Sequence, residues 1–110
     1  MVQLTPLHLE GRTAVGITVD LPRTRLVMAA TEAGYLMCGA LDVGLLNTQL
    51  ADRRIVAGRA LGVRTLEELL AAPLQAVTDA ARQLGLHEGM SGREALQLLA
   101  QAADGSGGRP

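Results

Sequence analysis

The first third of the chain alternates apolar side chains with small or polar ones at the two-residue period of a β-strand. The alternation is clearest over residues 14–21, where Val, Ile, Val and Leu fall at every second position, as is typical of a half-buried strand. Residues 5–9 alternate in the same way, and Gly11 followed by Arg12 predicts a tight hairpin connection. Pro6 cannot donate a ladder hydrogen bond, so we expect the first strand at an edge of the sheet or at a bulge.

Three more strands are predicted, over residues 26–30, 35–38 and 55–63. The first of these segments is continuously apolar, which suits a strand covered on both faces. The last would carry Gly58 and Gly62 on one face. Two glycines in a strand cost stability, and they indicate a bulge or the close approach of another backbone or a ligand.

Capping signals and helical spacing predict helices over residues 40–54, 65–72, 74–84 and 91–103. Thr65 and Ser91 each begin a capping box, in which the hydroxyl accepts the amide three residues on and a Glu side chain reaches back. Pro73 interrupts the helical pattern between the second and third of these segments.

Strands first and helices later predict an α+β fold with a mostly antiparallel or mixed sheet of about five strands and three to four helices, mainly after the strands. A chain of 110 residues has no room for a second core, so we expect a single compact domain over residues 1–103. Residues 104–110 are rich in Gly and predict a disordered tail.

The composition predicts a core of small side chains. The chain has no Phe and no Trp, and Tyr35 is its only aromatic residue. Leu, Val, Ile, Met and Ala must fill the interior, and they bury little area per side chain. Because short domains bury a small share of their surface, we expect a homo-oligomer, in which association adds stability.

Charge and composition exclude several classes of function. The 10 basic residues balance 11 acidic ones, and base stacking needs aromatic platforms that the chain does not have, so we expect no nucleic-acid partner. The first residues lack the pattern of a secretory signal, and no apolar run approaches the roughly 20 residues that span a bilayer, so we expect no membrane and a cytoplasmic location. Metals and nucleotide cofactors are not expected either, because one cysteine with two distant histidines matches no ligand spacing and no phosphate-loop motif occurs.

Cys38 is one candidate functional residue, because it stands at a strand end before Gly39 and an expected helix start. Amides at that start would stabilise its thiolate, and Asp42 or a histidine could orient it as a nucleophile. The alternative is that Cys38 is a small core residue and Gly39 serves the turn. The two histidines, His8 and His87, have no sequence relation to Cys38.

Arg59 is the second candidate, because the alternation places its charge beside apolar neighbours, where it needs a partner. Asp42 and Asp20 are candidate ion-pair partners. The alternative partner is a small anionic ligand, such as a phosphate or a carboxylate, held also by Arg64 and by the helix start at Thr65.

Four segments together resemble the YunC-like family of small bacterial and archaeal domains: residues 34–43, 55–60, 62–65 and 90–96. The resemblance covers nearly the whole chain, from Val2 to about Leu99. It implies a compact α+β fold. It carries no established activity, cofactor or catalytic residue to these positions.

Three functions therefore stay open, and the sequence leaves undecided whether the protein is an enzyme. The leading hypothesis is a cytoplasmic domain that binds an anionic metabolite or acts as an accessory domain, with a cleft near Cys38, Gly39 and Arg59. The first alternative is an enzyme that uses Cys38 on an acidic substrate. The second is a structural or protein-interaction module without a ligand.

Overall fold

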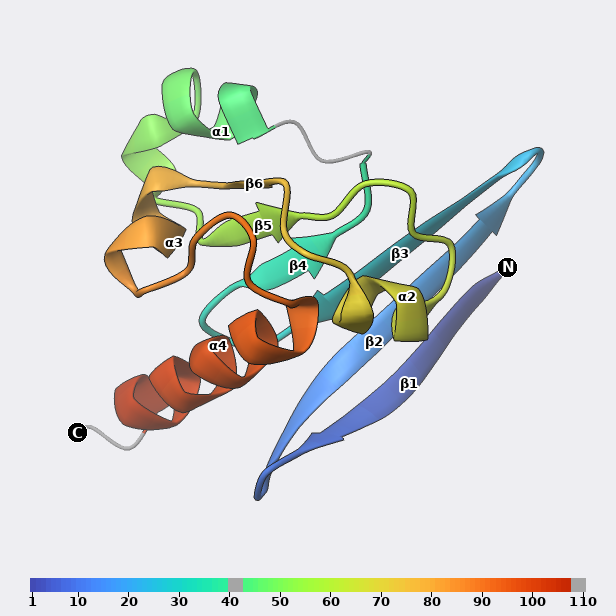
Figure 1. Ribbon diagram of the computed structural model, residues 1–110, viewed down its shortest axis with the longest axis horizontal. Coiled ribbons are helices and arrows are strands. Elements are labelled where there is room, and N and C mark those ends of the chain that lie inside the picture. The colour runs from blue at the N-terminus through green and yellow to red at the C-terminus, as the bar shows by residue number, and fades with distance from the viewer. Residues whose placement is uncertain (40–42, 108–110) are drawn as a thin grey trace.

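Six strands form one mixed sheet in which the strand order follows the chain from β1 to β6 (Figure 1). The computed structural model describes residues 1–39 and 43–107, with side chains as far as residue 103. β4 and β5 run parallel, and all other neighbours run antiparallel. The strands are β1 Val2–Leu9, β2 Arg12–Leu21, β3 Thr24–Ala30, β4 Tyr35–Met37, β5 Ala57–Arg59 and β6 Ala76–Val77.

The helices connect or follow the short strands. They are α1 Val43–Thr48, a 3₁₀ turn at Ala51–Arg53, α2 Leu66–Ala71, α3 Asp79–Gln83 and α4 Gly92–Gly107. α1 lies in the connection between β4 and β5, because parallel neighbours require a crossover. The expected α+β class, the mixed sheet and the number of helices are confirmed. Among the described residues, no helix has both the length and the apolar character needed to cross a membrane.

Several boundaries differ from those expected. α1 ends at Thr48 and a separate 3₁₀ turn follows at Ala51–Arg53, where one helix to residue 54 was expected. β5 ends at Arg59, because Gly62 adopts a left-handed conformation with φ +73° and turns the chain. Residues 74–84 are not one helix: they form β6 and then α3, which Thr78 caps by accepting the Ala81 amide at 3.2 Å. α4 extends to Gly107, beyond the expected end of the domain at residue 103.

Thr78 explains why the chain changes from β6 to α3 within residues 74–84. Its hydroxyl donates to the Ile55 carbonyl at 2.7 Å and accepts the Ala57 amide at 3.1 Å. These bonds tie the start of α3 to the start of β5, and they satisfy a polar side chain that is almost fully buried. A tertiary contact of this kind overrides helical spacing in the sequence.

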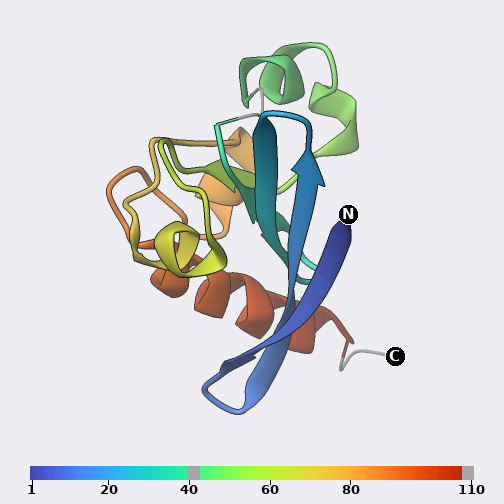
Figure 2. The ribbon, with the colours of Figure 1, turned by 90° about the vertical axis from the view of Figure 1, so that its right-hand side faces the viewer.

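The main core lies between the sheet and the layer formed by α2 and α4 (Figure 2). Leu36 from β4, Leu69 from α2 and Leu96 from α4 are fully buried in it. A smaller cluster on the other face joins Val43 and Leu46 of α1 to β5. Small side chains fill much of both clusters, as the composition predicts.

Glycines allow the helical layer to approach closely. A Cβ on Gly16 of β2 would lie 2.5 Å from Leu66 Cδ1 of α2, and a Cβ on Gly58 of β5 would lie 3.1 Å from Leu74 Cδ1. A Cβ on Gly92 of α4 would overlap the Leu69 carbonyl oxygen of α2. The close approach expected at Gly58 is therefore made by a leucine side chain of the same domain.

The apolar side of β2 faces away from α2 and α4. Ala14 is 2% exposed under the helical layer, whereas Val15 is 43% exposed on the opposite face. A half-buried strand usually buries its apolar side. β2 does the opposite, because the helices cover its small residues and its larger apolar residues are left exposed. The physical reason is the contact between Gly16 and Leu66, because only small residues fit beneath α2.

We expect Gly92→Ala to destabilise the protein. Gly→Ala at an unobstructed helical position is neutral or stabilising by up to ~1 kcal/mol. Here the new methyl group meets a backbone oxygen that cannot move without shifting α2, so we expect a loss of about 1–3 kcal/mol in the free energy of unfolding. Urea denaturation measures it, with Arg93→Ala at the next, exposed position as the control. A Gly92→Ala protein as stable as the parent would contradict this packing.

Candidate functional site

A cleft of about 660 Å³ opens where the β2–β3 hairpin meets the end of β4 and the loop before α2. Its wall is formed by Asp20, Arg23, Thr24, Arg25, Leu26, Cys38, Gly39, Gly62, Val63 and Arg64. Cys38, Gly39 and Arg64 were expected at such a site from the sequence, and the structure brings them together.

Register explains which side chains reach the cleft. Asp20 and Arg25 are paired across β2 and β3, so their side chains share one face of the sheet. Cys38 follows β4 on the same face and donates its amide to the Val27 carbonyl at 3.1 Å. Two arginines of the cleft thus come from the hairpin, and the thiol comes from the neighbouring strand.

The hairpin turn presents Arg23 in an uncommon conformation. Proline restricts φ of Pro22 to about −65°, and Arg23 then adopts a left-handed φ of +62°. For a residue with a Cβ this conformation costs roughly 1–2 kcal/mol. Glycine would adopt it without that cost, so the arginine is kept at the turn against a backbone preference.

Positive charge is in excess in the cleft. Arg25 Nε donates to Asp20 Oδ1 at 2.6 Å, and both side chains stay about half exposed. Within the described part of the chain, neither the Arg23 nor the Arg64 guanidinium has a carboxylate partner. Three arginines against one aspartate leave two positive charges for an anion, and guanidinium groups match the geometry of phosphates and carboxylates.

The capping box at α2 has the expected form and uses its own polar groups. Thr65 Oγ1 accepts the Glu68 amide at 3.1 Å, and Glu68 Oε1 accepts the Arg64 amide at 2.7 Å. The Arg64 and Glu68 amides are therefore bonded within the capping box, and the expected ligand role of Thr65 stays a prediction. Arg64 itself lines the cleft.

A second hollow of about 370 Å³ adjoins the cleft, because Arg25 and Arg64 line both. Gln3, Thr5 and Thr18 of β1 and β2 and the segment from Thr65 to Glu67 complete its wall. Its amide and hydroxyl groups are donors and acceptors without charge, and Glu67 adds one carboxylate. The arginine cleft thus continues into a polar surface that contains Thr65.

Cys38 is buried in the wall of the cleft and is 6% exposed. A Cβ on Gly39 would lie 3.2 Å from Leu61 Cδ2, so this glycine serves a close approach at the turn. Asp42 lies outside the described residues, and its expected role beside Cys38 stays a prediction. Neither histidine lines the cleft. Among the described residues of the cleft wall there is therefore no histidine that could act as a base for the Cys38 thiol.

Arg59 lies apart from the cleft. It is in register with Met37 and hence on the face of the sheet opposite to Asp20 and Cys38. Its Nε donates to Gln75 Oε1 at 2.9 Å. Asp20, one of its two expected partners, pairs with Arg25 instead, and Asp42 is not among the described residues. Arg59 is thus corrected from a residue of the cleft to a residue of the β5–β6 surface.

Sequence reasoning missed Arg23 and Arg25. The hairpin pairing of Asp20 with Arg25 was available from the two predicted strands, and it would have put both charges on one face. The contribution of Arg64 could not have been placed beside them, because it depends on α2 packing over β2.

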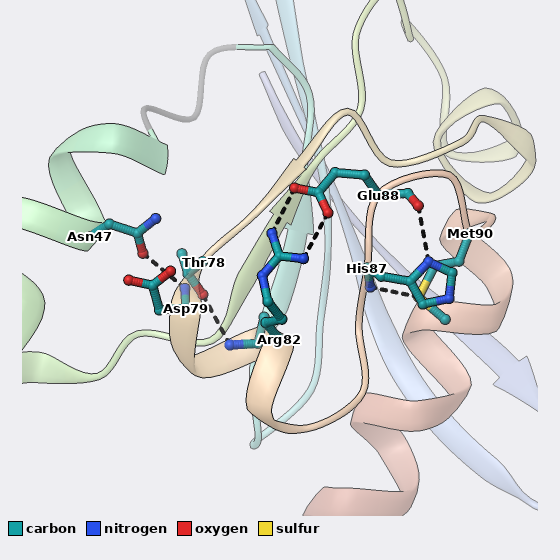
Figure 3. A network of polar contacts seen from close by, with 8 residues as sticks. Asn47, Thr78, Asp79, Arg82, His87, Glu88 and Met90 are labelled. Carbon is teal, nitrogen blue, oxygen red and sulfur yellow. Dashed lines mark hydrogen bonds and ion pairs between the residues drawn. The ribbon is translucent and has the colours of Figure 1, made fainter.

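A second polar cluster holds the loop between α3 and α4 (Figure 3). Arg82 donates to both carboxylate oxygens of Glu88, at 2.9 and 2.7 Å. His87 Nδ1 lies 2.9 Å from the Glu88 carbonyl oxygen, and Asn47 Oδ1 accepts the Asp79 amide at 2.9 Å. These contacts close the loop and dock α1 on α3. Among the described residues, no group of three His, Cys, Asp or Glu side chains could hold a metal ion.

Comparisons with known proteins give a consistent family. A family model described as "Domain of unknown function (DUF1805)" matches residues 37–99. The "Uncharacterized protein YunC" of Bacillus subtilis (strain 168) is 58% identical over 96 residues, which are 87% of this chain and 95% of that protein. The crystal structure of a protein of unknown function from Thermoplasma acidophilum matches with a TM-score of 0.80 and 26% identity, over 90% of this chain and 93% of that one.

We expect Cys38 to react slowly with iodoacetamide in the native protein. Its side chain is almost fully buried, so the reagent should reach it on the order of tenfold or more slowly than in the urea-unfolded chain. Mass spectrometry over time measures both rates. Equal rates would contradict the burial and favour an accessible thiol.

The Arg82–Glu88 pair predicts a carboxyl that titrates at low pH. Hydrogen bonds from the Arg82 guanidinium lower the pKa of Glu88 to about 2. In an unfolded chain the pKa would be about 4.3, so the stabilisation from this pair is complete above that pH and disappears as the pH falls through about 2. Carbon-13 NMR titration measures the shift. Arg82→Ala should return the pKa of Glu88 towards its ordinary value, whereas Arg93→Ala should not change it.

Proposed function

The chain belongs to the DUF1805 family of domains of unknown function, and we propose that it binds a small anionic ligand in the cleft beside the β2–β3 hairpin. The observation that carries the proposal is the convergence of Arg23, Arg25 and Arg64 on one cleft whose only described acidic residue is Asp20. Because Asp20 neutralises Arg25, the other two guanidinium groups are available for a ligand.

The ligand class follows from the groups in the wall. A volume of about 660 Å³ is within the range of metabolite sites, roughly 300–1,000 Å³. Tyr35, the single aromatic residue, packs against the α1 cluster on the other face, so no ring in the cleft could stack on a base. We therefore favour a phosphorylated or carboxylated metabolite without an aromatic group.

Backbone strain supports a role for Arg23. Residues held in the left-handed region without being glycine concentrate at functional sites, because the rest of the structure must compensate for their cost. Arg23 adopts such a conformation at the rim of the cleft. If Arg23 served only the turn, a glycine at this position would give a more stable fold, because glycine adopts the left-handed conformation without the cost.

The second candidate function is an enzyme that acts on the same anion, because Cys38 lies in the wall of the cleft that holds the arginines. The thiol would be the nucleophile and the guanidinium groups would hold an acidic substrate. Burial of Cys38 and the absence of a histidine among the described wall residues favour binding over catalysis.

The proposal places the protein in the cytoplasm as a homo-oligomer. A core made of small side chains in a short domain supports association.

Two arginines with the same backbone strain provide a matched test. Arg23→Gly removes the conformational cost of a φ of +62° at the cleft. Arg54→Gly removes the cost of a φ of +52° at a second hollow, which shares no wall residue with the cleft. We expect both variants to melt at or above the temperature of the parent. Only Arg23→Gly should weaken binding of pyrophosphate or citrate, by about 10- to 100-fold, since a hydrogen bond to a charged group contributes about 1.5–3 kcal/mol.

Isothermal titration calorimetry with inorganic phosphate, pyrophosphate and citrate measures this binding, and Arg64→Ala should weaken it similarly. Affinity should also fall as the salt concentration rises, because the site is open to solvent. A parent protein that binds none of the three anions, or an Arg23→Gly protein that binds them as well as Arg54→Gly does, would refute an anion site in this cleft.

A further inference from the structure

One face of the β1–β3 ribbon is apolar and exposed. Paired residues share a face, so the pairs Val2 with Val19, Leu4 with Ile17, and Ile17 with Met28 bring these side chains together beside Val15. Leu4 is 69% exposed, Val2 62% and Val15 43%. We call these six residues the apolar face: Val2, Leu4, Val15, Ile17, Val19 and Met28. A contiguous patch of this kind on a domain usually marks an interface.

The helical layer cannot cover this face. It packs on the other side of β2, where Gly16 admits Leu66 at a distance that no larger residue would allow. Figure 2 shows α2, in yellow, on one side of the hairpin formed by β2, in blue, and β3, in teal. α1 lies on the side of the apolar face but contacts β5, through Val43, Leu46 and Ala57. None of the described helices therefore lies over β1 and β2 on this side.

The apolar face is also without charge. The strand positions that point to this side over β1, β2 and β3 carry no Asp, Glu, Lys or Arg; His8 is the one titratable side chain among them, and Arg59 lies on this side only farther along, in β5. The charged residues of the hairpin, Asp20 and Arg25, point to the opposite side. A partner with a charged surface would thus lose hydration without gaining an ion pair, whereas a second copy would bring an equally uncharged surface with no repulsion.

We propose that the apolar face is the interface of a homodimer, in which two copies pack their β1–β3 ribbons face to face about a two-fold axis. Each copy presents the same surface to the other, as a two-fold interface requires. The two ribbons would form a sandwich with a dry interior about 10 Å thick. β2 would then bury both of its faces. The side with small residues packs under the helices of its own chain, and the apolar side packs against the second copy.

The small size of the apolar face predicts a weak, reversible association. Strands lie about 4.8 Å apart and rise about 3.3 Å per residue, so three strands of about eight residues present a footprint of roughly 400 Å². A standard interface buries about 800 Å² per partner. We therefore expect a reversible dimer with a dissociation constant on the order of micromolar rather than nanomolar.

The dimer goes beyond the proposed anion binding and leaves it possible. Asp20, Arg25 and Cys38 of the cleft wall lie on the opposite face of the sheet, and Leu26 is the wall residue paired with Val19 of the apolar face, so we expect both clefts of a dimer to stay open to solvent. Loss of the dimer in a variant would therefore leave anion binding intact, and loss of anion binding in Arg23→Gly would leave the dimer intact.

Sedimentation equilibrium of the parent protein from about 1 to 300 μM tests the proposal, over a range chosen to bracket a micromolar constant. The average mass should rise from monomer to dimer across this range. The melting temperature should rise with concentration as well, because association stabilises only the folded chain. A parent protein that stays monomeric throughout overturns the proposal without any variant.

Leu4→Glu and Gln3→Glu form a matched pair on one strand. Both residues are exposed, and they point to opposite faces of β1. Leu4→Glu puts two carboxylates into the interface of each dimer and should raise the dissociation constant at least about tenfold, a cost of 1.4 kcal/mol or more. Gln3→Glu should dimerise like the parent. Circular dichroism confirms that both variants fold.

Three results would overturn the assignment of this face. Leu4→Glu could dimerise as tightly as the parent, Gln3→Glu could abolish the dimer, or the parent could stay monomeric and instead float with phosphatidylglycerol vesicles. The last result would identify the apolar face as a lipid contact. A dimer that Leu4→Glu alone disrupts supports the face-to-face interface.

Discussion

The close contact between the helical layer and the small residues of the sheet decides how the rest of the molecule is arranged. Leu66 of α2 lies over Gly16 of β2, and α4 begins where Gly92 meets the backbone at Leu69. These contacts leave room only for small side chains on that face of β2. The face of the sheet that carries Ala14 is therefore covered, and the apolar side of β2, with Val15, is left outside.

Two properties of the surface follow from this one constraint. α2 brings Arg64 over the same face as Arg25, so positive charge gathers at the end of the hairpin. The bulkier side chains of β2, such as Val15, and Leu4 beside them on β1 point the other way. Over β1 to β3, the charged side chains Asp20 and Arg25 thus lie on one side of the sheet and the exposed apolar face lies on the other, whereas Arg59 of β5 shares the side of the apolar face. A domain divided in this way can bind an anion on one side and a second copy on the other without competition between the two.

Local features of the chain were predictable because the residues that make them are neighbours in sequence. The hairpins, the edge position of β1 with Pro6 and the capping boxes at Thr65 and Ser91 all depend on turns, strand alternation and short-range hydrogen bonds. The predictions failed where a distant segment intervenes. Thr78 bonds to the β5 segment and splits one expected helix into β6 and α3, and the turn at Gly62 shortens β5.

The candidate site was only partly predictable for the same reason. Cys38, Gly39 and Arg64 were singled out by local signals and do line the cleft, whereas Arg59 is on the wrong face by one position of register. Arg23 adopts a left-handed conformation that its residue type does not indicate, because Gly, Asn and Asp are the residues that favour it.

By itself the sequence determined that the chain folds as one α+β domain, where its strands and helix starts lie and which side chains share a face. Alternation assigns residues to two faces, because successive side chains of a strand point in opposite directions. It does not say which face the helices cover. Only the tertiary structure decided that, because the fit of Leu66 against Gly16 depends on the shape of two surfaces far apart in the chain.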